Sequence, residues 1–240
     1  MRLSSAPTAT GGLVFRPAAE RFHSQLDWLD SRHSFSFAGH HDPAWMGFGP
    51  LRVINDDRIA AGTGFGMHSH REMEIITVVV EGQINHRDSL GHAEVLRAGE
   101  VQRMSAGTGV AHSEINEADQ PCRMLQIWIE PSTRGITPSY EQKPFAIGAD
   151  WTRLLDPDRR DGAMAIHRRV RLWRAQPPAG HGLALELAAG SAGWLQLIAG
   201  SGEVERRPLV EGDGLGFDAG SLRRFTAGGE GADLLLFELG

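Results

Sequence analysis

Short apolar segments rich in β-branched residues recur along the chain, separated by glycine, proline or acidic residues. Short runs bounded by turn-forming residues are typical of β-strands, and their close spacing is typical of sandwiches and barrels. Helical patterns are weak: Trp28–Asp30 and Ser139–Gln142 suggest only short turns. We therefore predict an all-β protein, with strands at Arg52–Ile54, Ile75–Val80, Gln83–Arg87, Glu94–Leu96, Met124–Ile129, Leu183–Leu187, Trp194–Ile198, Glu203–Arg206 and Leu234–Leu239.

Two glycine-rich segments resemble each other and indicate an internal repeat. LRAGEVQRMSAG (96–107) aligns with LVEGDGLGFDAG (209–220), and both end in Ala-Gly. Upstream, EGQI aligns with SGEV, which matches Gly82 with Gly202. The repeat predicts two copies of one β-barrel in the same chain.

A proline-bounded segment of low apolar content, residues 131–144, is expected to connect the two barrels. The predicted domains are accordingly residues 1–135 and residues 136–240.

Composition narrows the classes of function. Glycine accounts for 30 of 240 residues, roughly double the usual share of about 7%, which fits many tight turns. The net charge of −6 argues against direct binding of nucleic acid, and Arg159–Arg174 is expected to be a solvated basic face. A single cysteine, Cys122, excludes an intrachain disulfide. Neither a signal peptide nor an apolar run of roughly 18 residues is present, so a cytoplasmic protein is expected.

Four residues form two ligand-x-ligand pairs in the first copy: His68 with His70, and His112 with Glu114. In a strand, residues i and i+2 point to the same face. Two such strands facing each other across a barrel would supply three imidazoles and one carboxylate. This pattern predicts a metal site.

The repeat provides an internal comparison for these four residues. Equal offsets from the matched glycines place Ala188, Gly190, Phe225 and Ala227 at the corresponding positions of the second copy. None of the four can bind a metal through its side chain. A site needed only for folding would be expected in both copies, so the comparison favours chemistry in the first.

The motifs HSHREME and GEVQRMSAGTGVAHSEIN resemble the two motifs of the cupin family. More closely, GFGPLRV, GFGMHSHREMEIITVVVEG, HRDSLGH, GEVQRMSAGTGVAHSE and PSYEQ resemble the pirin family of bicupins over about the first 145 residues. The resemblance implies two tandem jelly-roll barrels. It also implies one divalent metal in the N-terminal domain, most often Fe(II), with Zn, Mn, Ni, Co or Cu as alternatives. The ligands that it implies are His68, His70, His112 and Glu114.

Glu74 is the residue whose role stays open. Many cupins use a glutamate four residues after the second histidine as a ligand, and strand parity would place Glu74 on the face of His70. The pirin resemblance assigns the carboxylate to Glu114, which leaves Glu74 as a hydrogen-bond acceptor for a ligand imidazole. The alternative is a structural partner for Arg71 or Arg103 at the barrel rim.

The resemblance implies a quercetin 2,3-dioxygenase-like oxidoreductase. Its substrate would be a small aromatic chelator that reacts with O₂ and undergoes ring opening, with Glu114 as the catalytic acceptor of the enol proton. Two alternatives remain: a non-enzymatic iron-dependent regulatory protein acting through a protein partner, and a zinc-dependent hydrolase or isomerase.

Several residues near the motifs are assigned structural roles. Phe65 and Met67 flank His68 with opposite parity and are expected to face away from the metal. Trp128 is expected in the core, and His86 and Asp88 in a hairpin. Three histidines beside Asp42-Pro43 are expected in a surface loop: His33, His40 and His41.

Overall fold

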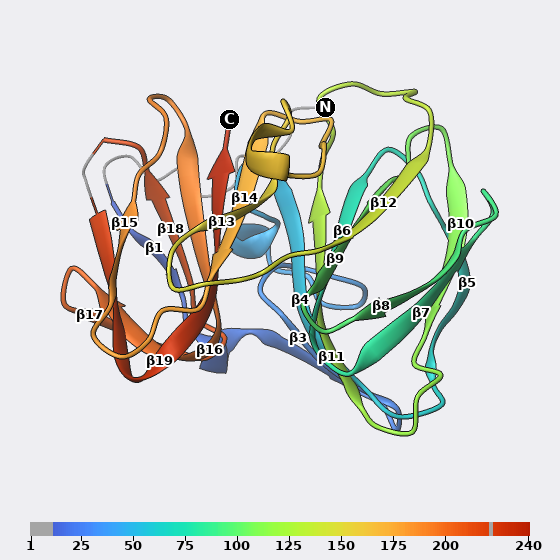
Figure 1. The fold of residues 1–240 in the computed structure, drawn as a ribbon, viewed down its shortest axis with the longest axis horizontal. Helices are drawn as coiled ribbons and strands as arrows, with labels where there is room; N and C mark the ends of the chain where they lie inside the picture. Colours follow the sequence, from blue (N-terminus) through green and yellow to red (C-terminus); the bar gives the residue numbers. More distant parts are fainter. Residues whose placement is uncertain (1–11, 221–222) are drawn as a thin grey trace.

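Two β-barrels lie side by side in the computed structural model, which describes residues 12–220 and 223–240 (Figure 1). Helix is limited to three short 3₁₀ turns in these ranges: η1 (Ala18–Glu20), η2 (Pro43–Trp45) and η3 (Arg160–Gly162). No helix in the described ranges is long and apolar enough to cross a membrane. The all-β prediction is confirmed.

The first barrel is built from two sheets. The seven-stranded sheet has the order β12 (Ser139–Pro144), β9 (Glu100–Ser105), β6 (Glu74–Glu81), β11 (Cys122–Ile129), β4 (Leu51–Ile59), β3 (Leu29–His33) and β2 (Phe22–Gln25). The four-stranded sheet has the order β5 (Gly64–His70), β10 (Val110–Ile115), β7 (Gln83–Asp88) and β8 (Ala93–Arg97).

The second barrel is one eight-stranded sheet. Its main path is β1 (Val14–Arg16), β18 (Gly214–Asp218), β16 (Ala192–Val204), β19 (Arg223–Leu239), β14 (Val170–Ala175) and β13 (Thr152–Leu155). Two further strands pair at its margin, β15 (Gly182–Leu185) with β19 and β17 (Arg207–Val210) with β16.

Strand β6 explains why some segments are apolar at consecutive positions rather than at alternate ones. Ile76 and Val78 belong to an apolar cluster that includes Trp194 and Phe237 of the second barrel. The intervening Thr77 points to the opposite side and donates a hydrogen bond to Glu114 of the facing sheet. Each face of β6 is therefore buried, one against the second barrel and one inside the first.

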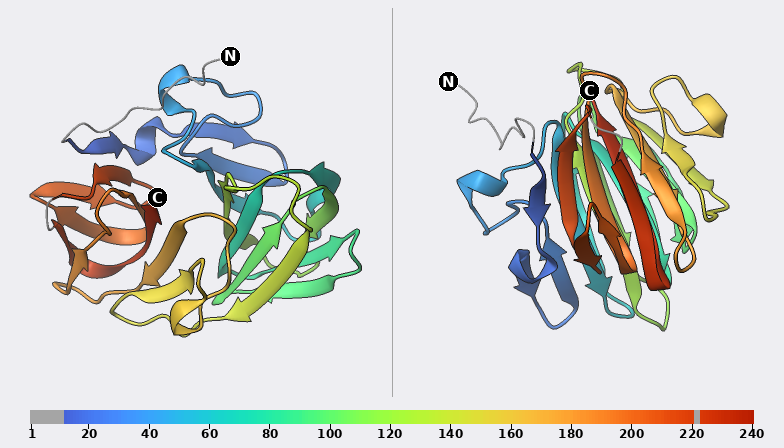
Figure 2. Two further views of the ribbon diagram at one scale, coloured as in Figure 1. Left: turned by 90° about the horizontal axis from the view of Figure 1, so that it is seen from above. Right: turned by 90° about the vertical axis from the view of Figure 1, so that its left-hand side faces the viewer.

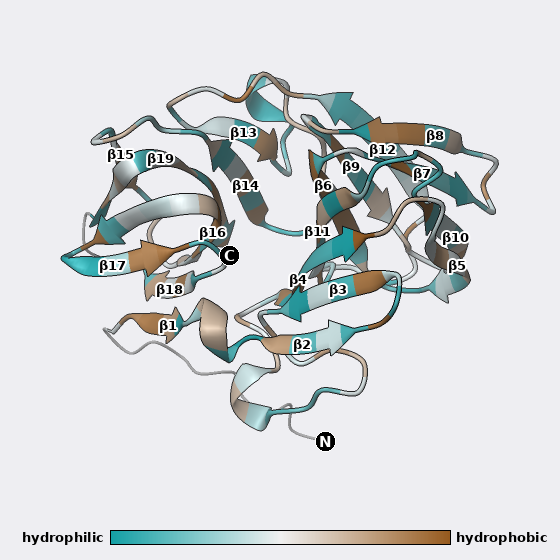
Figure 3. Ribbon diagram, turned by 90° about the horizontal axis from the view of Figure 1, so that it is seen from below, coloured by the Kyte–Doolittle hydropathy of each residue, from teal (hydrophilic) through white to brown (hydrophobic). Residues whose placement is uncertain are grey.

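Strand pairing crosses the predicted domain boundary in both directions. The N-terminal strands run along one side of both barrels (Figure 2), and β1 pairs with β18 of the second barrel (Figure 3). On the other side, β12 pairs with β9 of the first barrel, so only residues 131–138 of the expected connection are irregular. A division between residues 135 and 136 stays a prediction.

The repeat is visible in the backbone. Gly99 and Gly212, which the repeat aligns, turn with φ angles of 86° and 89°. The upstream match is wrong by two residues, because the counterpart of Gly82 (φ 73°) in the structure is Gly200 (φ 77°). A side chain at either position would meet backbone, of Pro121 and of Gly231 respectively.

The two segments expected to form short turns are in strands instead. Residues Ser139–Gln142 lie in β12, and Leu29 and Asp30 begin β3. Both strands pair with neighbours distant in sequence, and this non-local pairing outweighs weak local preference.

Candidate metal centre

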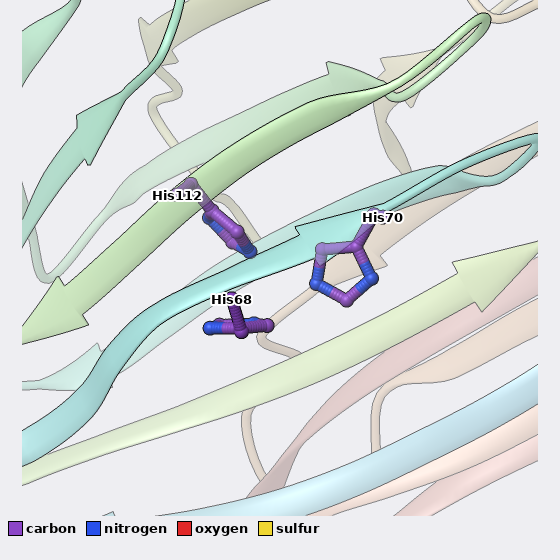
Figure 4. A group of neighbouring side chains, drawn as sticks. All are labelled: His68, His70 and His112. Atoms are coloured by element: carbon purple, nitrogen blue, oxygen red, sulfur yellow. The ribbon is translucent and has the colours of Figure 1, made fainter.

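Three imidazoles converge on the inner side of the four-stranded sheet (Figure 4). His68 and His70 come from β5 and His112 from β10, and antiparallel pairing sets His112 opposite His68. The ring centroids lie 4.5 Å apart for His68 and His112, 4.7 Å for His68 and His70, and 4.9 Å for His70 and His112. One nitrogen of each ring lies within 4.8 Å of the others, so the three can bind one metal ion.

The environment keeps two of these rings neutral. Burial, followed by the neighbouring imidazoles, lowers the pKa of His112 to about 3 and that of His70 to about 4. Neutral imidazoles retain the lone pair that a metal requires.

Hydrogen bonds indicate which nitrogens are free. His68 Nδ1 lies 2.8 Å from the carbonyl oxygen of Gly66. A carbonyl only accepts, so Nδ1 carries the proton and Nε2 is left as the lone-pair nitrogen. His112 Nε2 is buried and has no hydrogen-bond partner among the described residues. A buried acceptor without a partner is costly, and a metal ion at this position would satisfy it.

Glu114 extends from β10 across the interior of the barrel to the facing sheet. Gln126 Nε2 donates to Oε2 at 2.6 Å, and Thr77 Oγ1 donates to Oε1 at 3.1 Å. Gln102 Nε2 lies 3.5 Å from Oε1. Ligand atoms of Glu114, His112 and His86 also lie within 4.8 Å of one another. The Glu114 carboxylate therefore lies next to the three imidazoles, and His112 belongs to both groups of potential metal ligands.

A cavity of about 330 Å³ borders His68, His70 and Glu114. Its aromatic lining comprises Trp28, Phe37, Phe65 and Trp128, and its polar lining comprises Ser24, Ser31, His33, Asn55, Asp57 and Gln126. The polar groups are held in place: His33 Nδ1 lies 2.7 Å from Asn55 Oδ1, and Ser31 donates to Asp57. This size and mixture of groups suit a small aromatic ligand with polar substituents.

Two of the structural assignments near the motifs are wrong, those of Phe65 and His33. Phe65 lines the cavity because the β5–β10 pairing slips by one residue between His68 and Phe65, and a β-bulge of this kind reverses strand parity. Trp128 packs against a core cluster, as expected, and also lines the cavity, with its ring edge-on to His70 at 4.9 Å. His33 is a buried residue of β3 rather than part of a surface loop. Met67 is exposed, as expected.

Glu74 does not share a strand with His70. Chain reversal at residues 71–73, where Glu72 has a φ of 54°, places β5 and β6 in different sheets. Glu74 Oε2 instead accepts a hydrogen bond of 2.8 Å from Ser105, and Oε1 lies 3.3 Å from His167 Nδ1. The strand-parity argument that placed Glu74 on the face of His70 is therefore wrong, and the observed partners of Glu74 are Ser105 of β9 and His167 of the second barrel.

The polar residues around the imidazoles were missed, among them Asn55, Asp57, Thr77 and Gln126. A signal for two of them is present in the sequence, since Thr77 and Gln126 interrupt the apolar runs IITVVV and MLQIWI. A polar residue buried within such a run must find a polar partner. Here that partner is Glu114 for both.

The second barrel does not repeat the site. Within the described ranges, every group of three or more metal-binding side chains lies in the first barrel. With Gly200 matched to Gly82, the positions of His68 and His70 correspond to Glu186, which is exposed, and Ala188. Phe225 and Ala227, the counterparts of His112 and Glu114, are buried in an apolar cluster.

Two tandem barrels of this topology, with a histidine cluster in the first, define a bicupin. Comparison with known proteins gives the family. Residues 15–129 match the pirin family model, and residues 154–239 match the model of the quercetinase C-terminal cupin domain. The chain belongs to the pirin family.

Similar proteins match most of the chain. The quercetin 2,3-dioxygenase of Escherichia coli is 44% identical over 204 residues, covering 85% of this chain and 88% of that protein. A pirin-like protein of Caulobacter vibrioides is 40% identical and covers 88% of this chain and 92% of its own length. The crystal structure of the bacterial pirin YhhW from Escherichia coli in complex with nickel(II) is 42% identical, with a TM-score of 0.91 over 95% of this chain and 99% of that chain.

Proposed function

We propose that this pirin is a mononuclear non-haem metal dioxygenase that holds Fe(II) at His68, His70, His112 and Glu114. The proposal is carried by one observation: His68, His70 and the Glu114 carboxylate border one aromatic-lined cavity, and ligand atoms of His112 lie within 4.8 Å of those of all three. Imidazole and carboxylate ligands with open positions are typical of non-haem Fe(II) oxygenases rather than of closed structural zinc sites. The nickel bound by a related pirin supports a divalent-metal site.

The proposed substrate is a flavonol such as quercetin, opened by reaction with O₂. The name of the Escherichia coli relative supports this substrate class. The cavity supports it independently, because aromatic rings can stack on a planar substrate while Ser31, Asn55 and Asp57 offer partners to its hydroxyl groups.

Glu114 is the proposed acceptor of the enol proton of the flavonol. Gln126 and Thr77 fix its carboxylate with hydrogen bonds, so its orientation does not depend on the substrate. When bound, the ion supplies Lewis-acid and redox chemistry, while Trp128 and Phe65 position the rings and exclude water.

The test is O₂ uptake by protein loaded anaerobically with Fe(II) and mixed with quercetin, together with detection of the ring-opened product. We expect His112→Ala to lose both the iron and the activity. His181→Ala is the matched control, because His181 belongs to the second barrel and pairs with an exposed Asp150. It should retain wild-type metal content and turnover.

Two outcomes would contradict the proposal. Turnover by metal-free His112→Ala at the wild-type rate would show that the site is not catalytic. Absence of O₂ uptake by fully iron-loaded wild type, across a series of flavonols, would instead favour the regulatory alternative.

A further inference from the structure

Two residues of the β7 hairpin region lie directly behind His112. In the β7–β10 pairing, Asp88 is opposite His112 and His86 is opposite Glu114. The side chains of His86 and Asp88 are completely buried, and the His86 ring stacks on Tyr140 with centroids 4.7 Å apart. These two side chains form a hydrogen-bonded chain to His112: Asp88 Oδ2 to His86 Nε2 is 3.2 Å, and His86 Nδ1 to His112 Nδ1 is 3.4 Å.

The protons of this chain can be counted from Asp88 outward. Asp88 Oδ1 accepts the backbone N–H groups of Leu90 and His92, at 2.9 and 3.0 Å. Asp88 Oδ2 accepts from the rings of His86 and His92. A carboxylate only accepts, so His86 Nε2 carries the proton, and a neutral His86 has its lone pair on Nδ1. His112 Nδ1 must then donate to His86, which leaves the lone pair of His112 on Nε2.

We infer that Asp88 and His86 are positioning residues that fix His112 in the tautomer with its Nε2 lone pair facing the metal site. The inference rests on the proposed metal site and explains why His112 Nε2 is buried without a partner among the described residues. Metal-binding histidines generally donate their other N–H to a carboxylate or carbonyl. His68 does this directly through Gly66, whereas His112 does it through an intervening imidazole.

Asp88→Asn tests the direction in which protons are donated along the hydrogen bonds from His112 to Asp88, and it leaves all proposed metal ligands unchanged. The two backbone N–H groups hold the amide oxygen at the Oδ1 position, so the amide NH₂ faces His86. A donor at that position forces the His86 proton to Nδ1 and the His112 proton to Nε2, where it blocks the metal. We expect Co(II) to bind about 10- to 100-fold more weakly, as for other second-layer substitutions, with an altered visible absorption spectrum of the bound ion.

Two controls separate positioning from folding. His92→Ala removes the other ring that contacts Asp88 but leaves the chain to His112 intact, and it should bind Co(II) as wild type does. His86→Asn offers an acceptor near the position of Nδ1, whereas His86→Phe keeps the stacking on Tyr140 without an acceptor. We expect the Asn variant to retain higher Co(II) affinity than the Phe variant at equal thermal stability of the metal-free proteins.

The outcomes distinguish this inference from the proposed function. Wild-type Co(II) affinity and spectrum in Asp88→Asn and His86→Phe, with Co(II) lost in His68→Ala, would overturn the positioning role and leave the metal site intact. Undiminished Co(II) binding by His68→Ala would overturn the metal site, and the inference with it. If Asp88→Asn does not fold, the two His86 variants decide the question, and equal affinities would overturn it.

Discussion

Asp57 is a fully buried carboxyl group of the cavity lining. Burial, aided by the charges of Asp56 and Glu114, outweighs the hydrogen bond from Ser31 and raises the pKa of Asp57 to about 7, from 3.8 in an unfolded chain. Between these two values the folded state holds a proton that the unfolded state has released. The free energy of unfolding must therefore fall as pH rises through this window.

Asp57→Asn should remove this contribution. We expect the unfolding free energy of the metal-free variant to decline less from pH 4.5 to pH 7 than that of wild type, the difference in slope reaching at most about 1.4 kcal/mol per pH unit. Urea denaturation across the pH range measures it, with the exposed Asp27→Asn as control. Parallel slopes for wild type and Asp57→Asn would contradict the raised pKa.

At the scale of single residues, the sequence predicts the imidazoles of the site better than their surroundings. The i, i+2 spacing of His68 and His70 is local and survives in the strand. Phe65 and Trp128 could not be assigned to the cavity, because their direction depends on a bulge and on which face of β11 is inside the barrel. Both depend on pairing with strands distant in sequence.

At the scale of elements, apolar side chains fill the interior of the second barrel, whereas the interior of the first barrel contains the cavity. Phe225, the counterpart of His112, packs over Gly202, and Phe217 packs over Gly193. Neither glycine has a positive φ, so neither is required by a turn. Instead, the missing side chain leaves space for an aromatic ring against the sheet. Part of the high glycine content, which predicts turns, therefore reflects aromatic packing instead.

Gly202→Ala should destabilise the second barrel. The added methyl group would lie 2.6 Å from the backbone oxygen of Thr226 and also against the Phe225 ring, and overpacking of this kind typically costs about 1–3 kcal/mol. Gly229→Ala is the matched control, because no atom lies within 4 Å of an added Cβ at that position. Chemical denaturation provides the comparison, and equal stability of the two variants would show that Phe225 can move aside.

Strands were predictable from sequence where both faces are buried, as in β6 and β11, because continuous apolar runs identify them. The polar strands β2 and β12 and the short β1 were not predicted. Their pairing with β3, β9 and β18 supplies what local sequence lacks. β1 pairs with the second barrel and β12 with the first, each across the predicted domain boundary. This arrangement follows from the overall topology and could not be read from the sequence of either strand.

At the scale of the whole molecule, the two barrels share one apolar core. A single cluster contains Ile54, Ile76 and Ile127 of the first barrel together with Trp194 and Phe237 of the second. At the edge of this core, Arg123 of β11 makes two hydrogen bonds of 2.9 Å to Asp56 and one of 2.8 Å to the backbone oxygen of Ile198 in β16. Separating the barrels would expose the core and remove the Ile198 oxygen from Arg123, whereas the Arg123–Asp56 pair lies within the first barrel.

A shared core predicts that the barrels unfold as one unit and that a ligand of the first stabilises the second. Nickel(II) at about 100 times its dissociation constant should add about 2.7 kcal/mol to the unfolding free energy of the whole chain. We expect one calorimetric transition that moves to higher temperature with nickel. Hydrogen exchange should slow in β19 of the second barrel as well as in β10, since global unfolding limits exchange in both. His68→Ala should abolish both effects. Two transitions, or protection confined to the first barrel, would show instead that the barrels unfold independently despite their common core.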